Sequence, residues 1–292
     1  MYDLVIIGGG PAGVSAALYT ARAGLKTVII ENGANALARA HLIANYYGVT
    51  APGSQLYDAG LQQVRQLGVE IIHDEAVAAE YTGAGFTVTG SAAAEALQSR
   101  ALLLATGVKN ISIKLPDLER LTGHGVSYCA VCDGFFYRKK RVAVLGSGQY
   151  ALHEAEYLKH LAGSLIILTN GGDGSLARSA GFTVDERKLA ALSGDDKISG
   201  VVFADGGRLE LDGLFIALGT ADSTDLARKI GAHLNGRFIK IDDSGATNVP
   251  GLFAAGDCTG GVLQVAKAVH DGMTAANGII RYLRSAQQPA LK

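Results

Sequence analysis

The sequence reads Tyr2-Asp-Leu-Val-Ile-Ile-Gly8-Gly-Gly10-Pro-Ala-Gly13 close to its start. The apolar run before Gly8 predicts a buried strand, and the residues after Gly10 follow the pattern of an amphipathic helix. The turn between them uses Gly8 for a tight bend, Gly10 for close approach of a ligand to the backbone, and Gly13 for packing of the helix on the strand. The stretch therefore predicts a dinucleotide-binding βαβ unit, whose helix N-terminus receives a pyrophosphate.

The same pattern returns in the middle of the chain. Residues 141–161 again give a strand, a glycine turn and a helix, with Gly146, Gly148 and Ala151 each standing 138 positions after the glycines of the first turn (146 − 8 = 138). One glycine fingerprint is weak evidence, whereas two in register are strong. The chain is therefore expected to hold two dinucleotide-type units.

The first unit also carries a candidate ribose ligand. Its helix is expected to stop at Gly24, a residue type common just after a helix, and the next strand, Thr27–Ile30, ends in Glu31. A carboxylate at this place accepts hydrogen bonds from ribose hydroxyls. The alternative is a glycine turn that holds no ligand.

Two further segments repeat the arrangement of a strand followed by glycine. They are Leu102–Val108, which breaks at Gly107, and Gly251-Leu-Phe-Ala-Ala-Gly256-Asp257. Open α/β sheets bind ligands at the carboxyl ends of their strands, so Asp257 is a candidate ligand residue, although an Asp there also forms local turns without any ligand.

If both segments return to the first sheet, the second unit is an insertion. Residues 1–111 and 245–292 then form one domain, and residues 112–244 form the other. The expected fold class is α/β, with two Rossmann-like dinucleotide-binding domains of which the second is inserted into the first.

Composition excludes several classes of protein. The 292 residues are 48% hydrophobic and 18% charged with a net charge of -1, so the basic excess typical of nucleic-acid or anionic-membrane binding is missing. The N-terminus lacks a signal-peptide pattern, no apolar run approaches the roughly 18 residues of a membrane span, and three cysteines do not make an extracellular framework. A cytoplasmic protein is expected.

Just before the second glycine turn the sequence reads Cys129-Ala-Val-Cys132-Asp133-Gly. With this motif the chain resembles the low-molecular-weight, bacterial-type thioredoxin reductases, whose Cys-Ala-x-Cys-Asp-Gly redox site stands at the same place. The resemblance runs nearly end to end. Its other pieces are Gly8–Gly13, Asn45-Tyr-Tyr-Gly48 in place of the family's Asn-x-Pro-Gly, Ala105-Thr-Gly107 and Gly256-Asp257.

The resemblance implies that the outer domain binds FAD, that thioredoxin is the partner, and that the protein is a homodimer. It implies that Cys132 faces the flavin, that Cys129 attacks the partner disulfide, and that Asp133 is the general acid and base. The implied cofactor-binding residues are Gly8, Gly10, Pro11, Ala12, Gly13, Glu31, Asn45, Ala105, Thr106, Gly107, Gly256, Asp257, Gln264 and Val265.

The residues themselves support this chemistry. One cysteine of a Cys-x-x-Cys pair attacks a partner disulfide and the other resolves the mixed disulfide, while a flavin handles two electrons at once. A structural zinc site needs four ligands, and Cys258 is the one remaining cysteine, so zinc is disfavoured. Cys258 is expected to be a small buried residue near the flavin. His270, in a helix predicted over Val265–Ala276, is read as a surface or packed histidine, with a flavin-edge role as the alternative.

The electron donor is where the sequence departs from the family's commonest form. Members that use NADPH have a small residue before the Ala of the second turn and a His-Arg-Arg-x-x-x-Arg motif after the next strand. Here Tyr150 fills the small position, where its ring can occupy the space of a pyrophosphate, and no cation precedes Arg178 after the strand Leu165–Leu168. The residue equivalent to Glu31 is Thr169, so an NADH ribose also lacks its carboxylate.

In these departures the sequence resembles the ferredoxin-dependent flavin thioredoxin reductases, and ferredoxin is the expected donor, with NAD(P)H as the alternative. Two other functions stay open. One is a dithiol oxidase on the same scaffold, which hands electrons to oxygen. The other is a flavoprotein redox sensor without enzymatic activity, which Asp133 argues against because a sensor needs no proton-transfer group.

Overall fold

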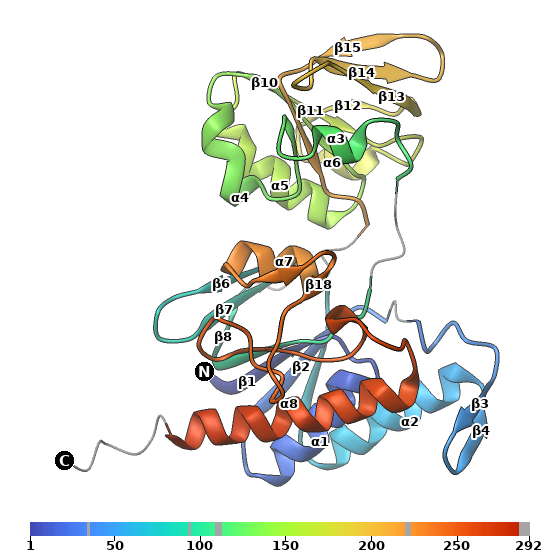
Figure 1. The fold of residues 1–292 in the computed structure, drawn as a ribbon, viewed down its shortest axis with the longest axis vertical. Helices are drawn as coiled ribbons and strands as arrows, with labels where there is room; N and C mark the ends of the chain where they lie inside the picture. Colours follow the sequence, from blue (N-terminus) through green and yellow to red (C-terminus); the bar gives the residue numbers. More distant parts are fainter. Residues whose placement is uncertain (34–35, 93–94, 109–112, 220–222, 286–292) are drawn as a thin grey trace. The chain divides into compact units, whose positions relative to one another are not determined.

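The computed structural model describes residues 1–33, 36–92, 95–108, 113–219 and 223–285. Contacts divide the chain into unit 1, Met1–Val108 with Asp222–Lys292, and unit 2, Lys109–Ala221. Each unit is built around a sheet with parallel strands (Figure 1). The expected α/β fold, with a second dinucleotide-type unit inserted into the first, is confirmed.

The chain returns to unit 1 earlier than the sequence analysis placed it. The return lies between residues 221 and 222, whereas 244/245 was expected; the other expected boundary, 111/112, lies outside the described residues. Helix α7 (Ser223–Ile230) packs on strand β6 (Ala76–Tyr81) of unit 1, and the β17–β18 hairpin follows it. These contacts join residues far apart in the sequence, so no local pattern indicates them.

The large sheet of unit 1 has the order β5-β2-β1-β8-β7-β6, with β19 paired to β8. Strand β8 is eight residues long, so its first half pairs antiparallel with β7 and its second half parallel with β19. The strands of unit 1 not yet bounded are β1 (Tyr2–Ile7), β2 (Thr27–Glu31), β3 (Ile43–Tyr46), β4 (Val49–Ala51), β5 (Glu70–His73), β7 (Phe86–Gly90), β8 (Leu97–Leu104), β17 (Leu234–Asn235), β18 (Phe238–Ile239) and β19 (Leu252–Ala254).

Helix α1 (Pro11–Arg22) packs against α2 (Gly53–Gln66) and against α8 (Val265–Ser285). The backbones of α1 and α8 come so close that a Cβ at Gly272 would lie 2.1 Å from the carbonyl oxygen of Ala12. Helix α8 was expected to end at Ala276, which is wrong. It continues because Ile279 and Leu283 extend its buried face into the core of unit 1.

Unit 2 has a parallel sheet of order β12-β11-β10-β16-β9 and a separate antiparallel sheet, β13-β14-β15. Its strands are β9 (Val126–Ser127), β10 (Arg141–Leu145), β11 (Ser164–Leu168), β12 (Thr183–Asp185), β13 (Leu189–Ser193), β14 (Gly200–Phe203), β15 (Arg208–Glu210) and β16 (Gly213–Ile216). Its helices are α3 (Leu118–Leu121), α4 (Ala130–Asp133), α5 (Gln149–Lys159) and α6 (Ser175–Ser179), and a 3-10 turn, η1 (Gly134–Tyr137), follows α4.

The internal repeat is visible in the strand register. Leu4 pairs with Thr27 in unit 1, and Val142 pairs with Leu165 in unit 2, each 138 positions later (142 − 4 = 138). In each glycine turn the first glycine lies against the backbone carbonyl group of the residue that follows a neighbouring strand. A Cβ would lie 2.4 Å from Ala105 O in the first turn and 2.1 Å from Ala217 O in the second.

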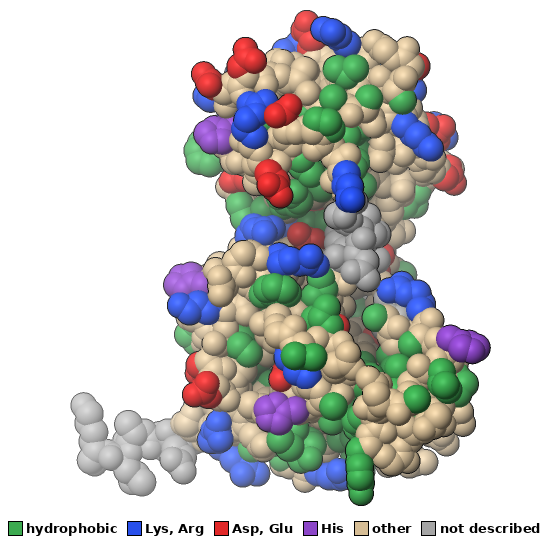
Figure 2. Space-filling model, turned by 45° about the vertical axis from the view of Figure 1, so that its right-hand side comes forward, with side chains coloured by type: hydrophobic (Ala, Val, Ile, Leu, Met, Phe, Trp, Pro, Cys, Tyr) green, Lys and Arg blue, Asp and Glu red, His purple; other side chains and the backbone are tan. Residues whose placement is uncertain are grey.

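In the described part of the chain, no helix is both long and apolar enough to cross a membrane. On the face drawn in Figure 2, acidic and basic side chains are interspersed within each unit.

Candidate active site

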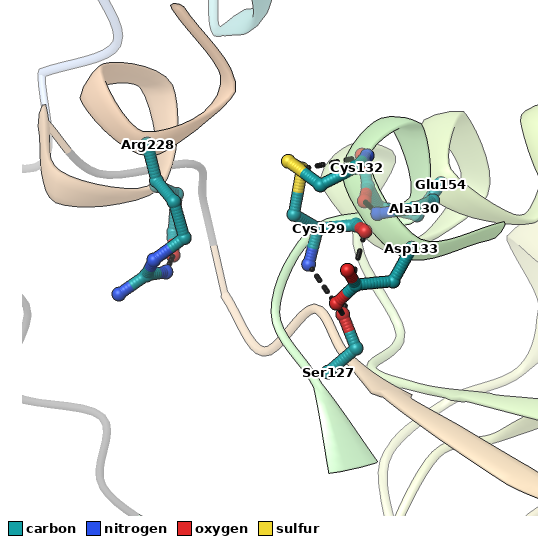
Figure 3. Close-up of a disulfide and its surroundings, with 8 residues drawn as sticks. Ser127, Cys129, Ala130, Cys132, Asp133, Glu154 and Arg228 are labelled. Carbon is teal, nitrogen blue, oxygen red and sulfur yellow. Dashed lines mark hydrogen bonds and ion pairs between the residues drawn. A yellow bond between two sulfur atoms is a disulfide. The ribbon is translucent and has the colours of Figure 1, made fainter. Parts of the chain in front are cut away.

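The two cysteines of the motif stand at the start of α4 and form a disulfide with a Cα–Cα distance of 5.3 Å (Figure 3). Cys129 is the N-cap residue, and its Sγ accepts a hydrogen bond from the Cys132 N–H at 3.1 Å. A sulfur at a helix N-terminus is where a thiolate is favoured. Cys129 is only 2% exposed, whereas Cys132 is exposed.

Asp133 is held beside the disulfide by a serine that the sequence analysis did not identify. Ser127, buried at the end of β9, donates a hydrogen bond from Oγ to Asp133 Oδ2 at 2.6 Å and accepts one from the Cys129 N–H at 3.1 Å. One hydroxyl therefore fixes both the carboxyl group and the backbone of the first cysteine. The three predicted catalytic residues are brought together within unit 2.

A second residue that was missed is Glu154 on α5. It is 2% exposed, and its Oε2 accepts a hydrogen bond from the Ala130 N–H at 2.9 Å (Figure 3). A weak sequence signal existed, because Glu154 stands where the first unit has Ala16 (154 − 138 = 16) on a face expected to be apolar.

In unit 1 the first glycine turn forms a cradle at the start of α1. Gly10 is the N-cap, Pro11 is the first helical residue, and a Cβ at Gly10 would meet nothing within 4 Å. By contrast, a Cβ at Gly13 would lie 1.9 Å from Gly8 O. The turn is thus closely packed where the helix meets the strand. It is open at the N-terminus of the helix, where Gly10, Pro11 and Ala12 follow one another, and an anionic group needs this open space.

Glu31 ends β2 with a side chain that is only 3% exposed. Its Oε2 accepts hydrogen bonds from the Gly33 N–H at 2.7 Å and from the Tyr57 hydroxyl. Its Oε1 is buried without a hydrogen bond, and Nδ1 of His73 lies against it, which makes an ion pair when that imidazole is protonated. Oε1 is therefore the atom that suits a ribose hydroxyl. Tyr57 and His73 were not identified from the sequence.

The turn that follows β19 is fixed from α8 by Lys267. Its Nζ donates to Gly256 O at 2.9 Å and to Thr259 Oγ1 at 3.0 Å, and it forms an ion pair with Asp271 at 2.7 Å. Gly256 has a φ of 84°, a conformation that favours glycine. Burial raises the pKa of Asp257, and Lys267 opposes that rise. Lys267 is a further residue that the sequence analysis missed.

The remaining predicted cofactor residues lie at two places in unit 1. The Asn45 side chain on β3 donates to Gln264 Oε1 at 2.8 Å, which joins the β3–β4 hairpin to the start of α8 at Val265. Ala105, Thr106 and Gly107 follow β8 beside the first glycine turn.

Thr106 itself caps a helix. Its N–H donates to Ser223 Oγ at 3.0 Å, and its Oγ1 accepts from the Ser223 N–H at 2.7 Å. The start of α7 is thereby tied to the end of β8.

The second glycine turn has a different environment from the first. The Tyr150 ring is fully buried on α5. Thr169, which corresponds to Glu31, is also buried, and its hydroxyl donates to Gly172 O at 2.7 Å. A Cβ at Gly172 would lie 3.1 Å from Ser147 Oγ, so the loop after β11 folds onto the glycine turn.

The same loop, residues 169–174, is held from its other side. The Asn170 side chain accepts a hydrogen bond from the Leu189 N–H at 2.8 Å, and the Gly171 N–H donates to Glu186 O at 2.8 Å. Arg178 forms an ion pair with Glu186 at 2.6 Å. The cation that follows this loop in sequence is therefore already paired within the protein.

Cys258 is buried, as expected, with its Sγ 3.3 Å from Ala255 O. The His270 side chain is 69% exposed, which agrees with the reading of a surface histidine. Over the described ranges, no three His, Cys, Asp or Glu side chains are grouped to hold a metal ion.

Comparisons with known proteins give a consistent result. Residues 2–272 match the family model described as pyridine nucleotide-disulphide oxidoreductase. The chain is 34% identical over 276 residues to a thioredoxin reductase of Streptomyces coelicolor, covering 87% of this chain and 85% of the relative.

Two solved structures are also similar. An atypical thioredoxin reductase from Desulfovibrio vulgaris Hildenborough gives a TM-score of 0.92 at 40% identity, covering 99% of this chain and 100% of the other. A ferredoxin-flavin thioredoxin reductase from Clostridium acetobutylicum gives a TM-score of 0.74 at 27% identity, covering 97% and 98%.

Proposed function

Because this chain belongs to the thioredoxin reductases of the pyridine nucleotide-disulphide oxidoreductase family, we propose that it carries electrons from a bound flavin through Cys129 and Cys132 to a thioredoxin disulfide. Membership makes the protein an oxidoreductase and implies a flavin cofactor. The observation that carries the proposal is the Cys129–Cys132 disulfide at the start of α4, with Asp133 held beside it by Ser127.

The proposed flavin is FAD, bound by unit 1. The open N-terminus of α1 at Gly10 suits the pyrophosphate, and Glu31 Oε1 suits the adenosine ribose. Three further parts of unit 1 complete the proposed site. They are the Gly256-Asp257 turn, residues Ala105–Gly107, and Asn45 with its hydrogen-bond partner Gln264 and the adjacent Val265. When bound, FAD supplies the two-electron chemistry that side chains lack.

This assignment predicts a yellow protein with one FAD per chain and a measurable role for Lys267. Lys267→Met removes the charged donor that fixes Gly256 O. A hydrogen bond from a charged group contributes about 1.5–3 kcal/mol, so the Kd for FAD is expected to rise about tenfold to a hundredfold. Titration of the apoprotein with FAD, followed by fluorescence, measures this change.

The matched control is Lys26→Met, an exposed lysine of unit 1 that lies over the Tyr2 ring and should leave the Kd unchanged. A colourless protein that FAD does not reconstitute would end the FAD assignment. Equal Kd values for FAD in the parent and in Lys267→Met would show that Lys267 has no role in FAD binding.

In the proposed reaction Cys129 thiolate attacks the thioredoxin disulfide, forming a mixed disulfide and releasing one thioredoxin sulfur, which takes a proton. Cys132 then attacks Cys129 Sγ, which releases the second thioredoxin thiol and restores the Cys129–Cys132 disulfide. Asp133 exchanges the protons, in the position that Ser127 gives it. In the disulfide form Cys132 is the exposed sulfur, so attack by Cys129 requires the reduced motif to expose it.

The proposed electron donor is reduced ferredoxin. The residues that would bind NAD(P)H in unit 2 are engaged with the protein itself: Thr169 bonds Gly172, and Arg178 pairs with Glu186. The residue at the ribose position, Thr169, and the first Arg after the loop, Arg178, are therefore already bonded within the protein. The similarity to a ferredoxin-flavin thioredoxin reductase supports the same donor.

A dithiol oxidase would use the same residues but pass electrons to oxygen. A single turnover separates the two functions. The enzyme is photoreduced without oxygen and mixed with oxidised thioredoxin, and two thioredoxin thiols are expected per flavin reoxidised. Flavin reoxidation by air together with no thiol formation on thioredoxin would favour the oxidase.

A further inference from the structure

Glu154 is a buried acid that the reaction proposed above does not use. It lies on the inner face of α5, which packs against α4, and it is 2% exposed. Its counterpart in the first unit, Ala16, is fully buried on α1 and serves packing alone. Burying a carboxyl group costs free energy unless it is hydrogen-bonded, so an acid at this position calls for a reason beyond packing.

Glu154 contacts the redox motif itself. Its Oε2 accepts the Ala130 N–H at 2.9 Å, directly after Cys129. Cys129 Sγ accepts the Cys132 N–H at 3.1 Å. The first N–H groups of a helix have no partner within the helix. At the start of α4 a carboxyl oxygen accepts the one of Ala130, and a sulfur accepts the one of Cys132 (Figure 3).

We propose that Glu154 is a positioning residue that fixes the first turn of α4 and, through its negative charge, restrains the ionisation of Cys129, which makes the reduced pair a stronger electron donor. This inference rests on the proposed redox role of the pair.

The effect of Glu154 on the reducing power of the pair follows from charge balance. Reduction of the disulfide takes two electrons and two protons to give two thiols, or one proton when Cys129 stays as thiolate. A carboxylate nearby disfavours the thiolate and leaves the neutral disulfide unaffected. Removing that charge stabilises the reduced form, so the pair holds its electrons more firmly.

The test is Glu154→Gln in the full-length flavoprotein, because glutamine keeps an acceptor for the Ala130 N–H and removes the charge. Iodoacetamide alkylation of the reduced protein is measured against pH, and mass spectrometry identifies Cys129. The midpoint is expected about one pH unit lower than in the parent. In glutathione buffers at a pH above both alkylation midpoints, the reduced form is expected to be favoured about tenfold more, which corresponds to about 30 mV.

The matched control is Glu156→Gln, an exposed acid on the same helix that pairs with Lys159. It should reproduce the parent curves. The other ionisable groups around the motif, which are Asp133 and Cys132 on α4, Tyr137 on η1 and Tyr150, His153 and Tyr157 on α5, are unchanged in both variants.

A parent-like alkylation curve and glutathione equilibrium for Glu154→Gln would overturn the inference. If that variant does not fold, Glu154→Ala, which copies the residue of the first unit, is held to the same criterion. Neither readout uses an electron donor or thioredoxin, so a wrong donor assignment leaves the inference standing. A pair that does not equilibrate with glutathione at all would instead contradict the proposed function.

Discussion

Replacing Cys129 or Cys132 by serine is expected to abolish thioredoxin reduction, with a loss on the order of 10³-fold or more, because the two sulfurs act in relay and a hydroxyl does not replace either. Flavin binding should be unchanged, since the pair lies in unit 2 and the proposed FAD site lies in unit 1. Steady-state turnover and the flavin spectrum of each purified variant measure the two effects.

The two variants also assign the roles of the sulfurs. With Cys132→Ser, Cys129 is expected to remain joined to thioredoxin in a stable mixed disulfide, while Cys129→Ser should not trap the partner. Cys258→Ser, which changes the buried cysteine outside the disulfide, is the matched control and should keep turnover. Trapping only by Cys129→Ser would exchange the roles, and loss of flavin from both variants would make the pair structural.

NADPH is expected to reduce the flavin poorly, and adding charge to the loop of unit 2 should not correct this. Asn170→Arg with Gly171→Arg supplies two guanidinium groups that can pair with a 2′-phosphate. If charge alone were missing, contacts of about 1.5–3 kcal/mol each would tighten NADPH by at least about tenfold. We expect little gain, because the buried Tyr150 ring takes volume that a small residue would leave free.

The loop is a second obstacle to NADPH binding by the double-Arg variant. Asn170 holds the Leu189 N–H, and Gly171 has a φ of 85° with a Cβ position 2.9 Å from the Lys188 side chain, so both substitutions disturb the loop. Anaerobic flavin reduction is compared in the parent, in the double-Arg variant and in the same variant with Tyr150→Ser. NADH is the control, since it lacks the 2′-phosphate. Rapid reduction by NADPH after the two Arg substitutions alone would show that only charge was missing.

The repeated strand, glycine turn and helix are readable from the sequence because they depend on local spacing. Gly8 and Gly10 return as glycine 138 positions later, Gly13 is matched there by Ala151, and the strand register keeps the same offset. The return to unit 1 before α7 depends on packing against β6 and on the Thr106–Ser223 cap, which joins residues 117 positions apart. Such contacts leave no periodic signal.

The candidate site divides in the same way. Cys129, Cys132 and Asp133 form one continuous motif, so the sequence alone identifies them. Ser127, Glu154 and Lys267 act through hydrogen bonds to backbone or side chains that the fold brings near. A serine, an acid or a lysine in a helix or strand is ordinary by composition, and only its partner in space gives it a role.

The central claim is that electrons enter from a protein donor and leave through Cys129 and Cys132 to thioredoxin. The most direct measurement mixes the oxidised enzyme anaerobically with reduced ferredoxin, NADPH or NADH, each in the presence of oxidised thioredoxin, and follows the flavin spectrum and the thioredoxin thiols together. Reduced ferredoxin is expected to bleach the flavin and to yield two thioredoxin thiols for every two ferredoxins oxidised. Fast bleaching and thiol formation with NADPH, and none with ferredoxin, would contradict the account.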